Sequence, residues 1–169
     1  MTRELFERMR DESVEIDAEF VVAPSSLEEA AAVLAAAAES ALPVSFLGGG
    51  THQGYGNPAQ VDLIMTSSRL NRIVDWQPDD LTITVEAGVP IADLEDEIAG
   101  RRQTAVFPGT AQGATVGGVI ATGLSGYRRL RYGPTRDRVL QMQVATGYGK
   151  VVSGGSPVVK SSTGYGLQR

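Results

Sequence analysis

The stretch PVSFLGGGTHQGYG, residues 43–56, decides how this chain folds and what it binds. Its first five residues are mostly apolar and predict a strand that leads directly into Gly48, Gly49 and Gly50. Glycine allows successive backbone N–H groups to turn toward one point, and such a concavity binds anions. Thr51 adds a hydroxyl donor. On its own the loop indicates either a phosphate-binding site or a wide flexible turn.

A second glycine-rich stretch, PGTAQGATVGG at residues 108–118, follows about sixty residues later. Two such turns, both with threonines, suit a long ligand with two ends, such as a dinucleotide. Gly117 and Gly118 stand where a helix is expected to begin, so a flat ring can lie against the backbone there. The first loop does not match the G-x-G-x-x-G pattern that opens directly onto a helix, and the chain has no Walker A lysine. The two commonest nucleotide fingerprints are therefore absent.

The rest of the chain predicts a mixture of helices and strands. Residues 25–28 have the spacing of a capping box and predict the start of an alanine-rich helix, which ends before Pro43. Strands are expected at residues 20–22, 61–66, 72–76 and 81–86, helices at 2–11, 90–98 and 115–121, and a hairpin at 139–152. Trp76 and Phe107 are interpreted as core residues. This order excludes an alternating doubly wound sheet and indicates an α+β, sandwich-like α/β fold in two lobes.

Composition and charge exclude several classes of function. The chain has no cysteine, which excludes disulfides, thiolate catalysis and cysteine-ligated metals, and we expect no metal site. A net charge of −5 argues against nucleic acid as a partner. Residues 1–17 are charged and not typical of a signal peptide, and the apolar stretch at residues 30–38 is too short to span a bilayer.

Charge is unevenly distributed along the sequence. Residues 1–127 carry 7 basic and 19 acidic side chains, whereas residues 128–169 carry 8 basic and 1 acidic. Five of these basic side chains cluster near a single acid, Asp137: they are Arg128, Arg129, Arg131, Arg136 and Arg138. The cluster indicates either a solvated loop or the recognition of an anion, which would be a carboxylate substrate or an acidic partner subunit.

Several motifs resemble one family in order and spacing. The loop at residues 47–56 resembles the pyrophosphate loop of FAD-linked oxidases of the vanillyl-alcohol-oxidase type, whose nucleotide-binding unit is the PCMH-type FAD-binding domain. The strings LNRIVD at 70–75, TVEAGV at 84–89 and ATVGG at 114–118 resemble the same family. The strings GLSGYRRLRYGPTRD at 123–137, GGSPVVK at 154–160 and GYGL at 164–167 most resemble the smaller FAD-binding subunit of bacterial glycolate oxidase.

The resemblance covers nearly the whole chain from Ala18 onward, and it implies a two-lobed PCMH-type FAD-binding domain over residues 1–169. We expect one lobe at residues 18–104 and a second at residues 105–169, with FAD extended between them. The residues that match the family's cofactor site are Gly48, Gly49, Gly50, Thr51, His52, Gly54, Pro108, Gly109, Thr110, Thr115, Val116, Gly117, Gly118 and Val159.

The sequence departs from the family pattern toward its end. The family continues into another glycine motif and then a substrate-capping domain, whereas this sequence ends at Arg169 and has Gly166 where the family usually has aspartate. We therefore expect a C-terminally incomplete domain without the cap. His52 is the single histidine. A histidine that directly follows the glycine pair carries the flavin covalently in some relatives, but Thr51 intervenes here, so we expect His52 to contact phosphate or to be a plain loop residue.

The function implied by the resemblance is that of an FAD-dependent oxidoreductase, or its flavin-binding subunit, acting on a 2-hydroxy acid such as glycolate by hydride transfer to the flavin. No residue is assigned as the catalytic base. The alternative is a non-catalytic or vestigial FAD-binding unit that assembles with other chains. Expected partners are FAD, the hydroxy acid and further oxidase subunits with flavin and iron–sulfur centres. The expected location is the cytoplasm, at the inner membrane through those subunits.

Overall fold

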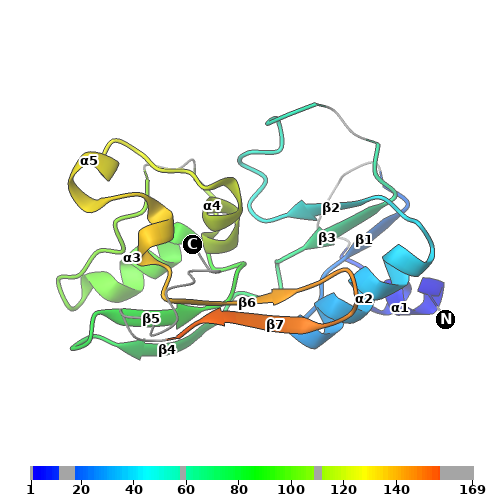
Figure 1. Ribbon diagram of the computed structural model, residues 1–169, viewed down its shortest axis with the longest axis horizontal. Helices are drawn as coiled ribbons and strands as arrows, with labels where there is room; N and C mark the ends of the chain where they lie inside the picture. Colours follow the sequence, from blue (N-terminus) through cyan, green and yellow to red (C-terminus); the bar gives the residue numbers. More distant parts are fainter. Residues whose placement is uncertain (1, 12–17, 58–59, 109–111, 157–169) are drawn as a thin grey trace.

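The computed structural model describes residues 2–11, 18–57, 60–108 and 112–156 (Figure 1). Its elements form two groups that lie side by side in the figure. One group contains a parallel sheet and the two N-terminal helices. The other contains an antiparallel strand pair and the central helices. A C-terminal hairpin packs on the first group.

The first group is built on a three-stranded parallel sheet with the order β1-β3-β2. The strands are β1 (Phe20–Val22), β2 (Val44–Leu47) and β3 (Leu63–Thr66). All four residues of the central strand β3 are buried, as expected for a parallel strand covered on both faces. The helices α1 (Thr2–Arg8) and α2 (Leu27–Glu39) supply the apolar partners in a core formed by Phe6, Met9, Val22, Ala30, Val33, Ala37, Leu63 and Met65.

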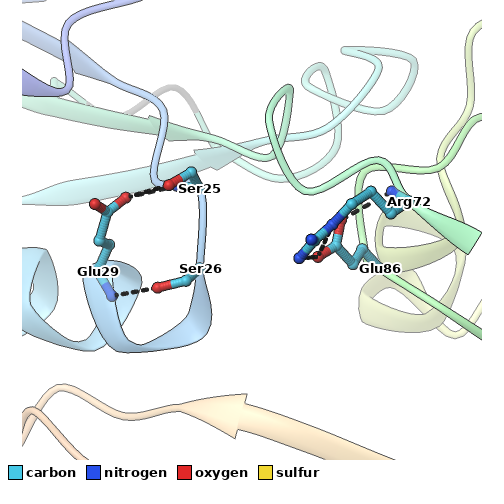
Figure 2. Close-up of polar contacts among 5 residues, drawn as sticks. All are labelled: Ser25, Ser26, Glu29, Arg72 and Glu86. Atoms are coloured by element: carbon cyan, nitrogen blue, oxygen red, sulfur yellow. Dashed lines mark hydrogen bonds and ion pairs between the residues drawn. The ribbon is translucent and has the colours of Figure 1, made fainter. Parts of the chain in front are cut away.

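The start of α2 corrects the predicted capping box by one residue. The N-cap is Ser26, not Ser25, and its hydroxyl accepts a hydrogen bond from the backbone N–H of Glu29 at 3.1 Å (Figure 2). The Glu29 carboxylate reaches back to the N–H and the hydroxyl of Ser25, both at 2.8 Å. These bonds hold the pKa of Glu29 below its ordinary value. The sequence contains two overlapping Ser-x-x-Glu patterns. The second is used, because its glutamate also accepts hydrogen bonds from the serine that precedes the cap.

The second group surrounds a separate core. The strands β4 (Ile73–Gln77) and β5 (Thr82–Val85) form an antiparallel pair joined by the predicted turn. The helices α3 (Ile91–Ala99) and α4 (Val116–Thr122) pack with them. The buried members are Val89, Ile91, Leu94, Ile98, Ala114, Val116 and Val119. Trp76 and Phe107, predicted as core residues, are half-buried against this cluster. This core includes residues that precede and residues that follow the predicted boundary between the two lobes, at residues 104 and 105. The lobe boundaries stay a prediction.

Pro90 lies one position outside the helix that it was expected to begin. It is the N-cap of α3, with extended backbone at φ −62° and ψ 140°. The reason is a bridge to the second glycine stretch, because Pro90 pairs with Thr115 and the N–H of Ile91 donates to the carbonyl of Ala114 at 2.9 Å. The start of α3 is thereby tied to the start of α4.

The arginine-rich segment contains two short helices that the sequence did not predict. They are α5 (Arg129–Tyr132) and the 3-10 helix η1 (Thr135–Arg138). The buried hydroxyl of Thr135 donates to the carbonyl of Leu124 at 2.7 Å, and the Thr135 N–H donates to the hydroxyl of Ser125 at 3.3 Å. These two bonds attach the segment to the end of α4.

The predicted C-terminal hairpin is confirmed as β6 (Gln141–Ala145) and β7 (Val151–Gly155). It packs on α2, since Ala145 lies against the first core and a Cβ added at Gly149 would lie 3.0 Å from the Cβ of Ala35. The predicted mixture of helices and sheets is therefore confirmed, with the boundaries of most elements shifted by one or two residues.

Candidate functional site

The two glycine-rich stretches meet in space. The loop after β2 rises beside α4 (Figure 1). A Cβ added at Gly48 would lie 2.4 Å from Oγ1 of Thr115, and one added at Gly49 would lie 1.6 Å from the carbonyl oxygen of Gly113. Real side chains cannot approach so closely, so the contact requires glycine at both positions of the first loop. The two stretches that the sequence separates by about sixty residues thus lie in direct contact.

The first stretch leaves its backbone donors free. Gly50 has a φ of +69°, a left-handed conformation that favours glycine. In the described part of the chain, the N–H groups of residues 48–54 make no hydrogen bond to a protein acceptor. The loop is largely exposed, and a Cβ at Gly54 would meet no atom within 4 Å. A row of unused donors on a glycine-rich backbone suits a phosphate or pyrophosphate.

The second stretch uses its donors within the protein. The N–H of Val116 donates to the carbonyl of Val89 at 2.9 Å, and that of Gly117 donates to Ala87 at 2.8 Å. The N–H of Gly118 donates to the Thr115 hydroxyl at 3.3 Å, which caps α4. A Cβ at Gly117 would lie 2.7 Å from the Cβ of Ala87. This glycine lets two backbones pack closely, so any cofactor contact here would be van der Waals packing.

A chain of contacts connects this packing to the first loop. The N–H of Ser67 donates to the carbonyl of Leu47, the residue before the glycines, at 3.0 Å. The N–H of Gly88 donates to the carbonyl of Leu70 at 2.7 Å, and a Cβ at Gly88 would lie 1.9 Å from the carbonyl oxygen of Ser67. The turn at residues 67–70 therefore supports both the end of β2 and the segment that holds α4.

An ion pair between Arg72 and Glu86 joins the start of β4 to the end of β5. The Arg72 guanidinium contacts Oε1 of Glu86 through Nε at 3.1 Å and through a terminal nitrogen at 2.6 Å (Figure 2). The backbone N–H of Arg72 also donates to Oε2 at 2.8 Å. The side-chain hydrogen bond from Arg72 is the main reason why the pKa of Glu86 is held below its ordinary value. The pair is structural, because it joins the residue directly before β4 to the residue directly after β5.

The polar residues of the first loop interact with one another. The Thr51 hydroxyl and Nδ1 of His52 are 2.8 Å apart, and the rings of His52 and Tyr55 meet edge to face at 5.0 Å between centroids. The Gln53 amide donates to the carbonyl of Phe46 at 3.0 Å. These contacts tether the loop to β2 and place His52 beside the free backbone donors.

The remaining predicted site residues lie at the edge of the second group or outside the described part of the chain. Pro108 is buried. Gly109, Thr110 and Val159 lie outside the described residues, so their proposed roles stay predictions.

Sequence reasoning missed Ser125 and Thr135, which anchor the arginine segment beside Pro108. The available signals were the Ser-Gly and Pro-Thr turn dipeptides that they form with Gly126 and Pro134.

Comparison with known proteins decides the family. The family described as "FAD binding domain" matches residues 18–155. The chain belongs to this FAD-binding domain family. Its similarity to solved structures agrees: an alkyldihydroxyacetonephosphate synthase superposes with a TM-score of 0.75 at 19% identity, covering 92% of this chain and 28% of the other. The α+β fold of the PCMH type, predicted from the sequence, is confirmed.

Two curated relatives share the domain. A D-lactate dehydrogenase of Archaeoglobus fulgidus is 35% identical over 150 residues, which is 87% of this chain and 33% of that protein. The glycolate oxidase subunit GlcE of Escherichia coli is 39% identical over 99 residues, which is 57% of this chain and 28% of that protein. The chain spans about a third of the length of the curated relatives that it matches.

The residues present fit the family's cofactor. FAD carries a pyrophosphate, and the FAD-binding domain offers unused N–H donors along residues 48–54 with no side chain blocking Gly54. The identification of FAD as the cofactor is therefore supported both by the family and by the loop. Among the described residues, no group of three or more histidines or carboxylates gathers in a way that could hold a metal ion. None of their helices is both long and apolar enough to cross a membrane.

Proposed function

We propose that this chain is the FAD-binding part of an oxidoreductase that oxidises a small 2-hydroxy acid such as glycolate or lactate. The observation that carries the proposal is the first glycine loop, whose free N–H donors at residues 48–54 match a pyrophosphate. The relatives named as a D-lactate dehydrogenase and a glycolate oxidase subunit support this substrate class. When bound, the flavin supplies the hydride acceptor.

This chain's own residues hold and orient the cofactor. The backbone of residues 48–54 binds the pyrophosphate, and Thr51 and Thr115 offer hydroxyls beside it. The close packing of Gly117 on Ala87 gives the ring a flat backbone surface. His52 lies in the phosphate loop, where its Nδ1 is hydrogen-bonded to the Thr51 hydroxyl, and we assign it to that loop. Covalent attachment of flavin at His52 is not part of the proposal.

A second candidate function is a non-catalytic FAD-binding unit that assembles with further flavin and iron–sulfur subunits in the cytoplasm, at the inner membrane. The similarity to a protein named as a subunit favours it. The two candidates agree on FAD and differ on whether this chain alone turns over a hydroxy acid.

One experiment separates the two functions. The purified chain is titrated with FAD, and the visible spectrum and flavin fluorescence are recorded before and after anaerobic addition of glycolate or D-lactate. Flavin uptake followed by bleaching of the flavin band supports the oxidoreductase. Uptake without bleaching supports the non-catalytic unit. A colourless chain that takes up no FAD contradicts both.

A further inference from the structure

A carboxylate and two hydroxyls meet at the end of β3, outside the two glycine-rich stretches. Oδ2 of Asp11 accepts the Thr66 hydroxyl at 3.0 Å and the Ser68 hydroxyl at 2.7 Å. The two hydroxyl oxygens lie 2.9 Å apart. Thr66 is buried, with 3% of its surface exposed, so its hydroxyl depends on these protein partners. The three side chains form a small polar cluster, called the Asp11 cluster below.

The backbone of Asp11 is fixed against the sheet. Its N–H donates to the carbonyl of Val21 in β1 at 2.9 Å, and the preceding residue, Arg10, forms a bridge with Val22. From this position the carboxylate reaches the central strand, 55 residues further along the chain. A carboxylate whose backbone is already fixed loses little conformational freedom when it accepts these bonds, so the cluster is well suited to hold its partners in place.

The two hydroxyls of the cluster flank the residue that holds the first glycine-rich stretch. Thr66 and Ser68 lie on either side of Ser67, whose N–H donates to the carbonyl of Leu47 at 3.0 Å. Leu47 is also the register partner of Thr66 in the sheet, and it directly precedes Gly48. Because a peptide unit is planar, the carbonyl of Leu47 and the N–H of Gly48 share one orientation. The hydrogen bond from Ser67 therefore sets the direction of the first N–H of the loop.

The other side of Ser67 is held by backbone. Its carbonyl accepts the N–H of Leu70 at 2.9 Å, and a Cβ added at Gly88 would lie 1.9 Å from that carbonyl oxygen. These contacts fix the carbonyl of Ser67, while the Asp11 cluster fixes the residues before and after it. Together they leave the Ser67 N–H directed at β2 and the glycine loop.

We propose that Asp11 is a positioning residue for the FAD pyrophosphate. Its carboxylate holds Thr66 and Ser68, and through Ser67 and Leu47 it orients the N–H groups at the start of the loop. The proposal rests on the proposed function, in which residues 48–54 bind the pyrophosphate. It adds to that function a residue of the N-terminal segment that lies outside both glycine-rich stretches.

The test compares Asp11→Ala with a matched control, Asp62→Ala, by the amide chemical shifts of the ¹⁵N-labelled chain and by FAD affinity. Asp62 is exposed and directly precedes β3, so the control removes the same charge at the opposite end of the same strand. We expect Asp11→Ala to shift the amide signals of Gly48, Gly49 and Gly50 and to weaken FAD binding roughly fivefold, because charge-assisted hydrogen bonds are lost. The control should leave both measurements at their wild-type values.

Substitutions of Ser68 separate positioning from a general loss of stability. If Asp11 acts through Ser68, the variant that carries both Asp11→Ala and Ser68→Ala should weaken FAD binding by less than the product of the two single effects. Ser68→Thr keeps the hydroxyl and is expected to bind FAD as the wild-type chain does. Because Ser68 is exposed, the comparison of Ser68→Ala with Ser68→Thr also decides the proposal if Asp11→Ala does not fold.

The proposal is overturned by unchanged FAD affinity in a folded Asp11→Ala chain, or by equal weakening in Asp62→Ala. It is also overturned if the effects of Asp11→Ala and Ser68→Ala multiply, or if Ser68→Ala and Ser68→Thr bind FAD equally well. If the wild-type chain binds no FAD, the proposed function fails. The amide signals of the three glycines in Asp11→Ala then still decide whether the carboxylate orients the loop, and unshifted signals contradict it.

Discussion

The two glycine-rich stretches of this chain meet in space, yet their backbones are used in different ways. Among the described residues, the N–H groups of the largely exposed residues 48–54 make no hydrogen bond to the protein, whereas residues 116–118 donate all of theirs to it. Gly54 borders open space, whereas Gly117 is pressed against Ala87. Glycine therefore serves as a ligand cradle in one stretch and as a packing residue in the other. The difference predicts which substitutions change stability and which change binding.

The largest effect is expected from Gly49→Ala, because Gly49 joins the two stretches. The added Cβ would lie 1.6 Å from the carbonyl oxygen of Gly113, and backbone cannot move aside as a side chain can. We expect a loss of about 3 kcal/mol in the free energy of unfolding, the upper part of the usual range for overpacking. FAD affinity should fall with it. Urea denaturation and fluorescence titration measure the two effects, and an unchanged stability would show that the stretches are not in contact.

Gly117→Ala is expected to act on stability first. Its Cβ would lie 2.7 Å from the Cβ of Ala87 and 2.8 Å from the Ala87 carbonyl oxygen, which accepts the Gly117 N–H. The expected cost is about 2 kcal/mol. Gly118→Ala is the comparison, because its added Cβ would meet a side-chain atom alone, Oγ1 of Thr115 at 3.2 Å, whereas that of Gly117→Ala would also meet backbone, and alanine favours the helix. Equal denaturation midpoints for the two variants would contradict the packing role of Gly117.

Thr115→Ala removes the cap of α4. The Gly118 N–H loses its acceptor, and we expect a cost of about 1 kcal/mol, the usual value for a lost N-cap. Thr115→Ser keeps the oxygen and is expected to retain most of the stability. Thermal denaturation of the two variants tests this, and the account would be wrong if serine and alanine were equally destabilising.

The smallest effect concerns the pH dependence of the Arg72–Glu86 pair. The pKa of Glu86 is lowered in the folded state, so the pair stabilises the fold above the unfolded-state pKa of about 4.3 and is lost as pH falls through the lower folded value. Wild type should exceed Glu86→Gln in denaturation midpoint at neutral pH and lose that advantage in acid. Glu97→Gln, an exposed control, should show no such change. Because Arg72 is exposed, the difference will be modest.

Much of the fold could be predicted from local patterns. The alanine-rich run after Ser25 predicted α2, and the glycines at 147 and 149 predicted the β6–β7 turn, because both signals act within a few residues. The segment with α5 and η1 was missed. Its helices are one turn long and depend on the buried hydroxyl of Thr135 reaching Leu124, a contact between residues eleven positions apart that no local pattern reports.

The candidate site was predictable only as a set of residues. The sequence marked glycines in both stretches as cofactor contacts, which stays a prediction, and the structure brings Gly48 and Gly49 against the second stretch. From the sequence alone, a glycine that leaves room for a ligand, such as Gly54, looks the same as one that leaves room for a neighbouring residue, such as Gly117 beside Ala87. That distinction depends on tertiary neighbours.

The central claim is that the N–H groups of residues 48–54 bind the FAD pyrophosphate, and it can be tested with Gly54→Val and Gly147→Val. Both glycines border open space and have no positive φ, so neither valine is expected to disturb the fold. The measurement is FAD affinity by fluorescence titration. The account predicts that Gly54→Val weakens FAD binding more than tenfold while Gly147→Val leaves it unchanged. Equal affinities in the two variants would contradict the claim.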